Sequence, residues 1–166
     1  IVAYLLVVLV HELGHGVAGW MQGSRDLVVV FGSHRDRCLF RVPCGPVAVE
    51  FRAGPRFFVT PPHCFFASPS PVRSPLRSLM LAAAGPAASA LLYLLTATDP
   101  AGGIRDFLRF SFPVTSFPSA LAFWALVGVV APLVPMRYSS LDGFPSDGLV
   151  ILLSLKRLTA GRQETA

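Results

Sequence analysis

The chain has 166 residues, of which 53% are hydrophobic and only 14% are charged. Soluble proteins average about 25% charged residues, so this composition disfavours an ordinary soluble domain and favours a membrane protein. The formal net charge is +5, but the arginines are scattered and form no compact basic helix, which argues against a nucleic-acid partner.

The first predicted element is an apolar helix from Ile1 to about Trp20, interrupted only by a polar group around His11. No basic segment precedes this run and no small-residue cleavage site follows it, so we interpret it as a mature helix and not as a signal peptide. The sequence starts inside the run without a Met. We therefore expect the chain to be a fragment of a longer protein.

Three short segments after this helix are β-branched or aromatic and are bounded by Gly or Pro: 27–31, 38–42 and 47–52. This pattern predicts strands of a small sheet. The last segment has its apolar residues at alternate positions, so we expect it to have one wet face. Residues 53–75 hold many prolines and predict an irregular connection. The range 24–75 is thus expected to be a β-rich and Pro-rich membrane-proximal insertion.

Two later runs, about 76–96 and 117–134, are long enough or nearly so to cross a bilayer, which needs ~20 helical residues. A shorter apolar helix is predicted at 148–158. The 24–77 connection carries eight arginines against three acidic residues, whereas the 98–112 loop is balanced. Because positively charged loops stay in the cytoplasm, we predict that the 24–77 connection is cytoplasmic.

The expected fold is therefore mainly α, in a multi-pass integral membrane protein. It has about three transmembrane helices, a shorter C-terminal helix, and a small β-sheet inserted after the first helix. The sequence does not predict an oligomeric state.

The polar group in the first helix reads His11-Glu12-Leu13-Gly14-His15. Histidines four residues apart lie on one helix face, so both imidazoles can ligate one ion. Glu12 lies to the side, where it can take a proton from a zinc-bound water that attacks a carbonyl carbon. The alternative is that neighbouring helices satisfy these side chains. However, ionisable groups in an apolar helix are costly and rare without a function, so we predict one catalytic Zn²⁺.

A catalytic zinc usually has three protein ligands and one open position. Two aspartates near an apolar segment could supply the third ligand. Asp147 directly precedes the predicted C-terminal helix, whereas Asp142 is followed by Gly143 in a predicted turn. We favour Asp147 and keep Asp142 as the alternative. A different role for Asp147 is capping of the helix, which Ser146 could also perform.

Other potential metal ligands have weaker support. Cysteines 38, 44 and 64 show no paired CxxC spacing, so they indicate neither a complete disulfide framework nor a zinc knuckle. His34, His63 and Cys64 stand in predicted loops or strand ends, with no helical spacing to the first histidine pair. We do not expect them to bind the metal.

Taken together, these motifs resemble the site-2 protease family of intramembrane zinc metalloproteases. The resemblance covers most of the chain and rests on three features in order: the HExxH helix, Gly85-Pro86-Ala87-Ala88-Ser89 in the second long helix, and the segment from Pro135 to Asp147-Gly148. It implies a single intramembrane protease core over residues 1–166. In that core His11, His15 and Asp147 would hold zinc, and Glu12 would be the general base. The implied activity is cleavage of membrane-anchored protein substrates, as in regulated intramembrane proteolysis.

The chain departs from the family pattern at Ser89 and Pro132, where the family often has asparagine. The resemblance links those asparagines to holding the substrate or ordering the site, so the departures bear on substrate handling more than on metal binding. Two other interpretations stay open. One is a catalytically inactive membrane relative that binds metal, and the other is a zinc hydrolase acting on a lipid or a small amide.

Overall fold

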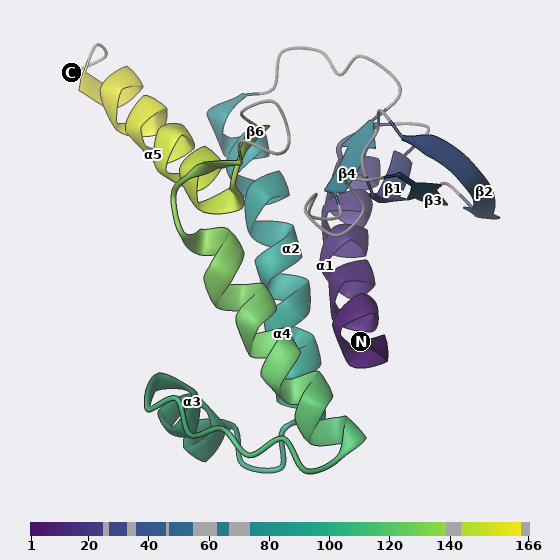
Figure 1. Cartoon of the computed structure of the whole chain (residues 1–166). Helices are drawn as coiled ribbons and strands as arrows, with labels where there is room; N and C mark the ends of the chain where they lie inside the picture. The colour runs from purple at the N-terminus through teal and green to yellow at the C-terminus, as the bar shows by residue number, and fades with distance from the viewer. Residues whose placement is uncertain are drawn as a thin grey trace.

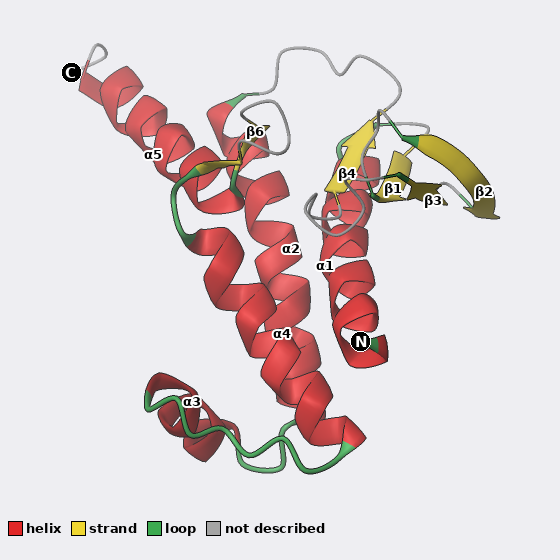
Figure 2. Cartoon of the chain, viewed as in Figure 1, coloured by secondary structure: helices red, strands yellow, loops and turns green. Residues whose placement is uncertain are grey.

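Helices make up most of the computed structural model, which describes residues 1–24, 27–32, 36–45, 47–54, 63–66, 74–138 and 144–163. The described helices are five: α1 (Val2–Met21), α2 (Pro75–Thr96), α3 (Pro100–Leu108), α4 (Phe117–Leu133) and α5 (Asp147–Gln163). A small mixed sheet follows α1 (Figures 1 and 2). The predicted class, mainly α with a sheet after the first helix, is confirmed.

Helix α2 is the central helix, because it contacts α1, α4 and α5 (Figure 1). Small residues allow α1 and α2 to approach closely. A Cβ added at Gly14 of α1 would lie 2.5 Å from the carbonyl oxygen of Ala84 and 2.8 Å from the Cβ of Ala88, both in α2. Further along, Val7, Tyr93 and Leu126 form a buried apolar cluster that joins α1, α2 and α4.

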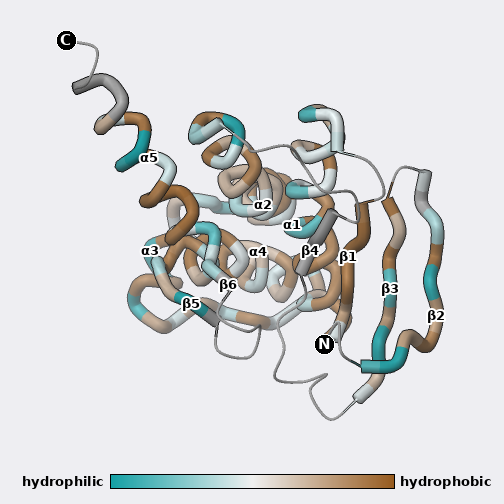
Figure 3. Tube along the Cα trace, turned by 90° about the horizontal axis from the view of Figure 1, so that it is seen from above, coloured by the Kyte–Doolittle hydropathy of each residue, from teal (hydrophilic) through white to brown (hydrophobic). Residues whose placement is uncertain are grey.

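Two of the described helices, α1 with 20 residues and α2 with 22, are long and apolar enough to cross a membrane. Helix α4 is apolar but has only 17 residues. It is therefore about 25 Å long, shorter than the ~30 Å hydrocarbon core. The prediction of about three spanning helices is thus supported for two of them. Figure 3 shows the apolar character of these helices against the more hydrophilic strands β2 and β3.

The sheet after α1 has the strand order β2-β3-β1-β4. Its strands are β1 (Leu27–Phe31), β2 (Arg37–Cys44), β3 (Val47–Ala53) and β4 (His63–Phe66). Strand β1 is parallel to β3 and antiparallel to β4, and β2 is antiparallel to β3. The three predicted strands are confirmed with shifted ends. The irregular connection predicted for 53–75 is wrong at β4, because four residues pair with β1 despite the prolines that flank them.

One face of the sheet packs on α1. Leu27, Val29 and Val49 form the buried cluster on this face, together with partly buried leucines of α1. The prediction of a wet opposite face on β3 is wrong for its first half, since Ala48 and Glu50 are each only 6% exposed. The carboxylate of Glu50 can be buried there because it forms ion pairs with Arg41 and Arg52.

Helix α3 lies in the 98–112 segment that the sequence analysis treated as a loop. Asp99 caps it, because the carboxylate accepts a 2.9 Å hydrogen bond from the backbone N–H of Gly102. Pro100 occupies the first turn, where a missing N–H costs nothing. The two glycines that follow, Gly102 and Gly103, are weak helix formers. A short antiparallel pair, β5 (Arg137–Tyr138) and β6 (Phe144–Pro145), then leads from α4 to α5.

Candidate metal centre

Helix α1 presents His11 and His15 on one face, as their spacing predicts. Both residues lie near the middle of the helix among its apolar residues. Their Nε2 atoms are 3.3 Å apart, and the two rings meet edge to face. The helix therefore brings two imidazole nitrogens to a single point on its surface.

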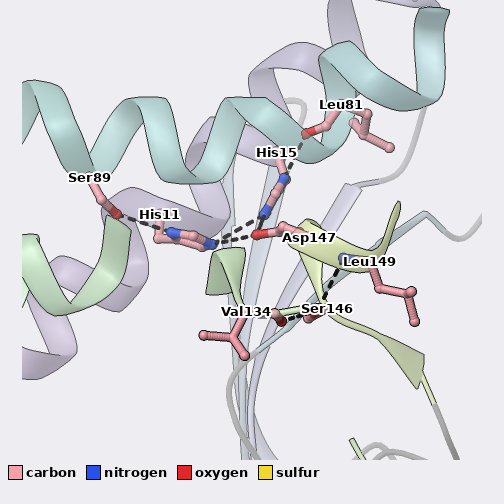
Figure 4. A network of polar contacts seen from close by, with 8 residues as sticks. All are labelled: His11, His15, Leu81, Ser89, Val134, Ser146, Asp147 and Leu149. Carbon is pink, nitrogen blue, oxygen red and sulfur yellow. Dashed lines mark hydrogen bonds and ion pairs between the residues drawn. The ribbon is translucent and has the colours of Figure 1, made fainter. Parts of the chain in front are cut away.

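Asp147 completes this group from the other end of the chain. It is the first residue of α5, 136 positions after His11. Its Oδ2 atom lies 3.2 Å from Nε2 of His11 and 3.3 Å from Nε2 of His15 (Figure 4). Among the residues that the structure describes, these three are the group able to hold a metal ion. Asp142, the alternative third ligand, lies outside the described residues.

Ser146, and not Asp147, provides the side-chain cap of α5. Its Oγ accepts hydrogen bonds from the backbone N–H groups of Leu149 at 3.3 Å and Met136 at 3.0 Å. The same hydroxyl donates to the carbonyl of Val134 at 2.7 Å. These three bonds use its full capacity and tie the start of α5 to the end of α4 (Figure 4). The Asp147 carboxylate is therefore available to the histidines.

Gly148 contributes to the same junction. A Cβ at this position would collide with the backbone carbonyl of Leu133, the last residue of α4. Only glycine allows α5 to start this close to α4. The end of α4 thus helps to determine where Asp147 lies.

Helix α2 contacts the outer nitrogen of each imidazole (Figure 4). Nδ1 of His15 donates to the carbonyl oxygen of Leu81 at 2.8 Å, and Nδ1 of His11 lies 3.0 Å from Oγ of Ser89. A carbonyl can only accept, so the His15 proton is on Nδ1, and in the neutral ring Nε2 carries a lone pair. The lone pair faces Asp147.

Gly85 of α2 makes room for both rings. A Cβ there would collide with Nε2 of His15 and lie 2.6 Å from Nε2 of His11. The next residue, Pro86, has no N–H and therefore interrupts the backbone hydrogen bonds of α2 at this level. The Gly-Pro pair thus lets α2 pass directly against the two histidines.

Three lone-pair atoms meeting in a partly buried site repel one another unless a proton or a cation lies between them. Two imidazole nitrogens and one carboxylate oxygen are ligands that zinc accepts, at about 2.0–2.2 Å each. Ligands at that distance from a tetrahedral ion lie about 3.3–3.6 Å apart. The separations of 3.2 and 3.3 Å in the structure are close to the short end of this range. The residues therefore fit a metal ion.

Glu12 is buried next to His11 but is not one of the three converging residues. One step along a helix rotates a side chain by about 100°, which takes Glu12 off the line of the histidines. Its role as a base stays a prediction. Of the weaker candidates, His34 lies outside the described residues, and only the backbone of His63 and Cys64 is described.

The sequence analysis missed the contact between Ser89 and His11, since it treated Ser89 only as a departure that affects substrate handling. A signal was present in the spacing. Leu81, Gly85 and Ser89 are each four residues apart, so they share one face of α2. That face is the one against which the histidines lie.

Neither a family model, a curated protein sequence nor a solved structure matches this chain. The functional argument therefore rests on the motifs of the sequence and on the geometry of the three converging residues.

Proposed function

We propose that this protein is a zinc-dependent endopeptidase of the site-2 protease type, which acts inside a membrane on membrane-anchored protein substrates. The observation that carries the proposal is the convergence of two imidazole nitrogens and one carboxylate oxygen at 3.2–3.3 Å separations, from opposite ends of the chain. These atoms lie within ion-pairing distance of one another, and one metal ion would satisfy all three at once.

The ligand set favours a catalytic ion. Structural zinc sites are closed by four protein ligands, whereas catalytic sites have three and keep one position open. Among the residues that the structure describes, His11, His15 and Asp147 are three. Zinc supplies a Lewis acid that polarises a carbonyl group and activates water near neutral pH. Mixed nitrogen and oxygen ligands suit zinc better than the all-oxygen sites of calcium or magnesium.

The side chains then have distinct tasks. His11, His15 and Asp147 hold the ion, and the Leu81 carbonyl holds the His15 ring by its Nδ1–H. Glu12 accepts a proton from the attacking water and returns it to the leaving amine. A buried carboxylate next to a metal ligand can act as a general base, so Glu12 supports hydrolysis over simple metal storage.

The surroundings of the site favour a membrane. The most apolar windows of α1 and α2 are only 39% and 28% buried inside the structure. The core helix of a soluble protein would be mostly covered, whereas here apolar side chains such as Leu94 and Leu95 lie open, the latter 75% exposed. Lipid is the natural cover for such surfaces. His11 then lies near the middle of a spanning helix, at the depth of a transmembrane substrate.

The sheet supports a peptide as the substrate. Strand β4 lies at one edge of the described sheet and contacts α1, the helix that carries the histidines (Figure 1). An unwound peptide can add to a sheet edge through backbone hydrogen bonds, which a lipid cannot do. A substrate strand beside β4 would run next to α1.

The test is zinc content together with cleavage of a model transmembrane peptide, for the purified wild type and for Glu12→Gln in detergent. We expect Glu12→Gln to keep its zinc and to cleave at least about 100-fold more slowly, because general-base catalysis contributes ~10²–10⁴. If Glu12→Gln cleaves as fast as the wild type, the mechanism is wrong. Zinc binding with hydrolysis of lipid or small amides alone, or with no turnover, would favour the two alternative functions.

A further inference from the structure

We infer that Ser89 is a positioning residue that orients the His11 imidazole for metal binding. The inference rests on the proposed function only in requiring that a metal binds to His11, His15 and Asp147. It assigns to Ser89 a role other than substrate handling.

The contact between the two side chains is direct and shielded from water. Nδ1 of His11 lies 3.0 Å from Oγ of Ser89, and Ser89 is 0% exposed. For Nε2 to offer its lone pair to a metal, the proton of the neutral ring must be on Nδ1. The Nδ1–H group then donates a hydrogen bond to Oγ of Ser89. A hydrogen bond at the outer nitrogen of a ligating histidine determines its tautomer and its ring orientation.

His15 provides an internal comparison. Its outer nitrogen donates to the Leu81 carbonyl, which belongs to the backbone of α2. The corresponding partner of His11 is the Ser89 side chain, on the same face of the same helix. Helix α2 therefore orients both imidazoles, once through a backbone atom and once through a side chain. Of the two partners, only the serine hydroxyl can be removed by substitution.

The position of Ser89 itself is closely defined by helix packing. A Cβ added at Gly128 of α4 would lie 2.9 Å from Ser89 Oγ and 3.1 Å from Cγ1 of Val7 in α1. The hydroxyl is thus enclosed between three helices and has little room to turn away from His11. If Ser89 served only as a small residue for packing, alanine would serve equally well.

The experiment measures zinc affinity by chelator competition for the purified wild type, Ser89→Ala and Ser89→Thr. Loss of such a hydrogen bond typically weakens metal binding about 10- to 100-fold, so we expect this for Ser89→Ala. Ser89→Thr keeps the hydroxyl and should bind zinc more tightly than Ser89→Ala does, even though its extra methyl group must fit the same enclosed space. The matched control is Ser154→Ala, which removes a buried serine hydroxyl from α5 about two turns after Asp147 and should leave the affinity unchanged.

The electronic spectrum of the Co²⁺-loaded protein is a second readout, because it reports ligand geometry and not only stability. We expect altered bands for Ser89→Ala and wild-type bands for Ser89→Thr. If Ser89→Ala does not fold, Ser89→Cys replaces it, since a thiol has a similar size and is a weak acceptor. Wild-type affinity and bands in Ser89→Ala or Ser89→Cys would overturn the inference, as would equal weakening by Ser89→Thr. Failure of the wild type to bind zinc would instead contradict the proposed function.

Discussion

Two groups of polar side chains in the described part of the chain are built around buried residues, Glu50 in the sheet and His11 between the helices, and they differ in how their charges are satisfied. In the sheet, Glu50 forms ion pairs with Arg52 at 2.6 Å and with Arg41 at 3.3 Å. There the guanidinium groups of the two arginines donate to the Glu50 carboxylate and neutralise its charge. Between the helices, Oδ2 of Asp147 lies 3.2 Å from Nε2 of His11 and 3.3 Å from Nε2 of His15, and these three atoms are able to hold one metal ion. The first cluster is complete in itself, whereas the second has the ligand atoms of a metal site.

The clusters also differ in how the chain assembles them. Arg52 is two residues from Glu50 on the same strand, and Arg41 is its direct partner in the β2–β3 register. The sheet cluster therefore forms with a single hairpin. The helical cluster needs α1, α2 and α5 in place, with its members 136 positions apart. We therefore expect substitutions in the helical cluster to lower the zinc affinity, and substitutions in the sheet cluster to lower the stability.

The largest effect is expected from Asp147→Asn, which removes the charged ligand of the helical cluster. Four-ligand zinc sites bind with about 10–16 kcal/mol, which is about 2.5–4 kcal/mol per ligand, so zinc affinity should fall by about two to three orders of magnitude. Asp142→Asn and Asp106→Asn should keep wild-type affinity. Chelator competition on the purified variants measures this. If Asp142→Asn lost affinity and Asp147→Asn kept it, the third ligand would be Asp142.

The second effect concerns the space that α2 leaves for the imidazoles. Gly85→Ala should push a methyl group into both rings, at a cost of about 1–3 kcal/mol, and weaken zinc binding about 10- to 100-fold. The matched control is Gly16→Ala in α1, where the nearest atom, Cγ2 of Val47, is 3.7 Å away. That variant should bind zinc normally. Equal zinc affinity in the two variants would show that the rings are not held against α2.

The smallest effect on metal binding is expected from Glu50→Gln, which disturbs the sheet cluster alone. The loss of a charged partner should lower the stability by about 1–3 kcal/mol, seen as a lower midpoint of thermal unfolding in detergent. Zinc affinity should not change. Asp106→Asn is the control, because its ion pair with Arg105 is long, at 3.8 Å, and exposed. A lower zinc affinity in Glu50→Gln would mean that the two clusters are coupled.

Periodicity and spacing predicted the parts of this molecule that depend on local sequence. The apolar runs located α1, α2 and α4, and the four-residue spacing predicted that His11 and His15 share a face. The sequence also favoured Asp147, but only the structure shows that Ser146 takes over the capping of α5. That choice depends on how α5 meets the end of α4, which a linear pattern does not encode.

Three of the features that the sequence analysis missed depend on contacts between distant segments. Strand β4 exists through its pairing with β1, and the buried face of β3 depends on two arginines that neutralise Glu50. The contact of Ser89 with His11 depends on how α2 crosses α1. Helix α3 is the exception, because its Asp-Pro start was visible in the sequence but was not used.

The junction at Ser146 and Gly148 also bears on the entropy of the unfolded chain. It places a ligand on the last helix, while the two histidines are on the first, so an ion held by all three would cross-link the ends of the fold across 136 positions. Closing so long a loop removes much of the entropy of the unfolded chain, as a long-range disulfide does. The ion would thus stabilise the whole arrangement of helices, including those that do not touch it.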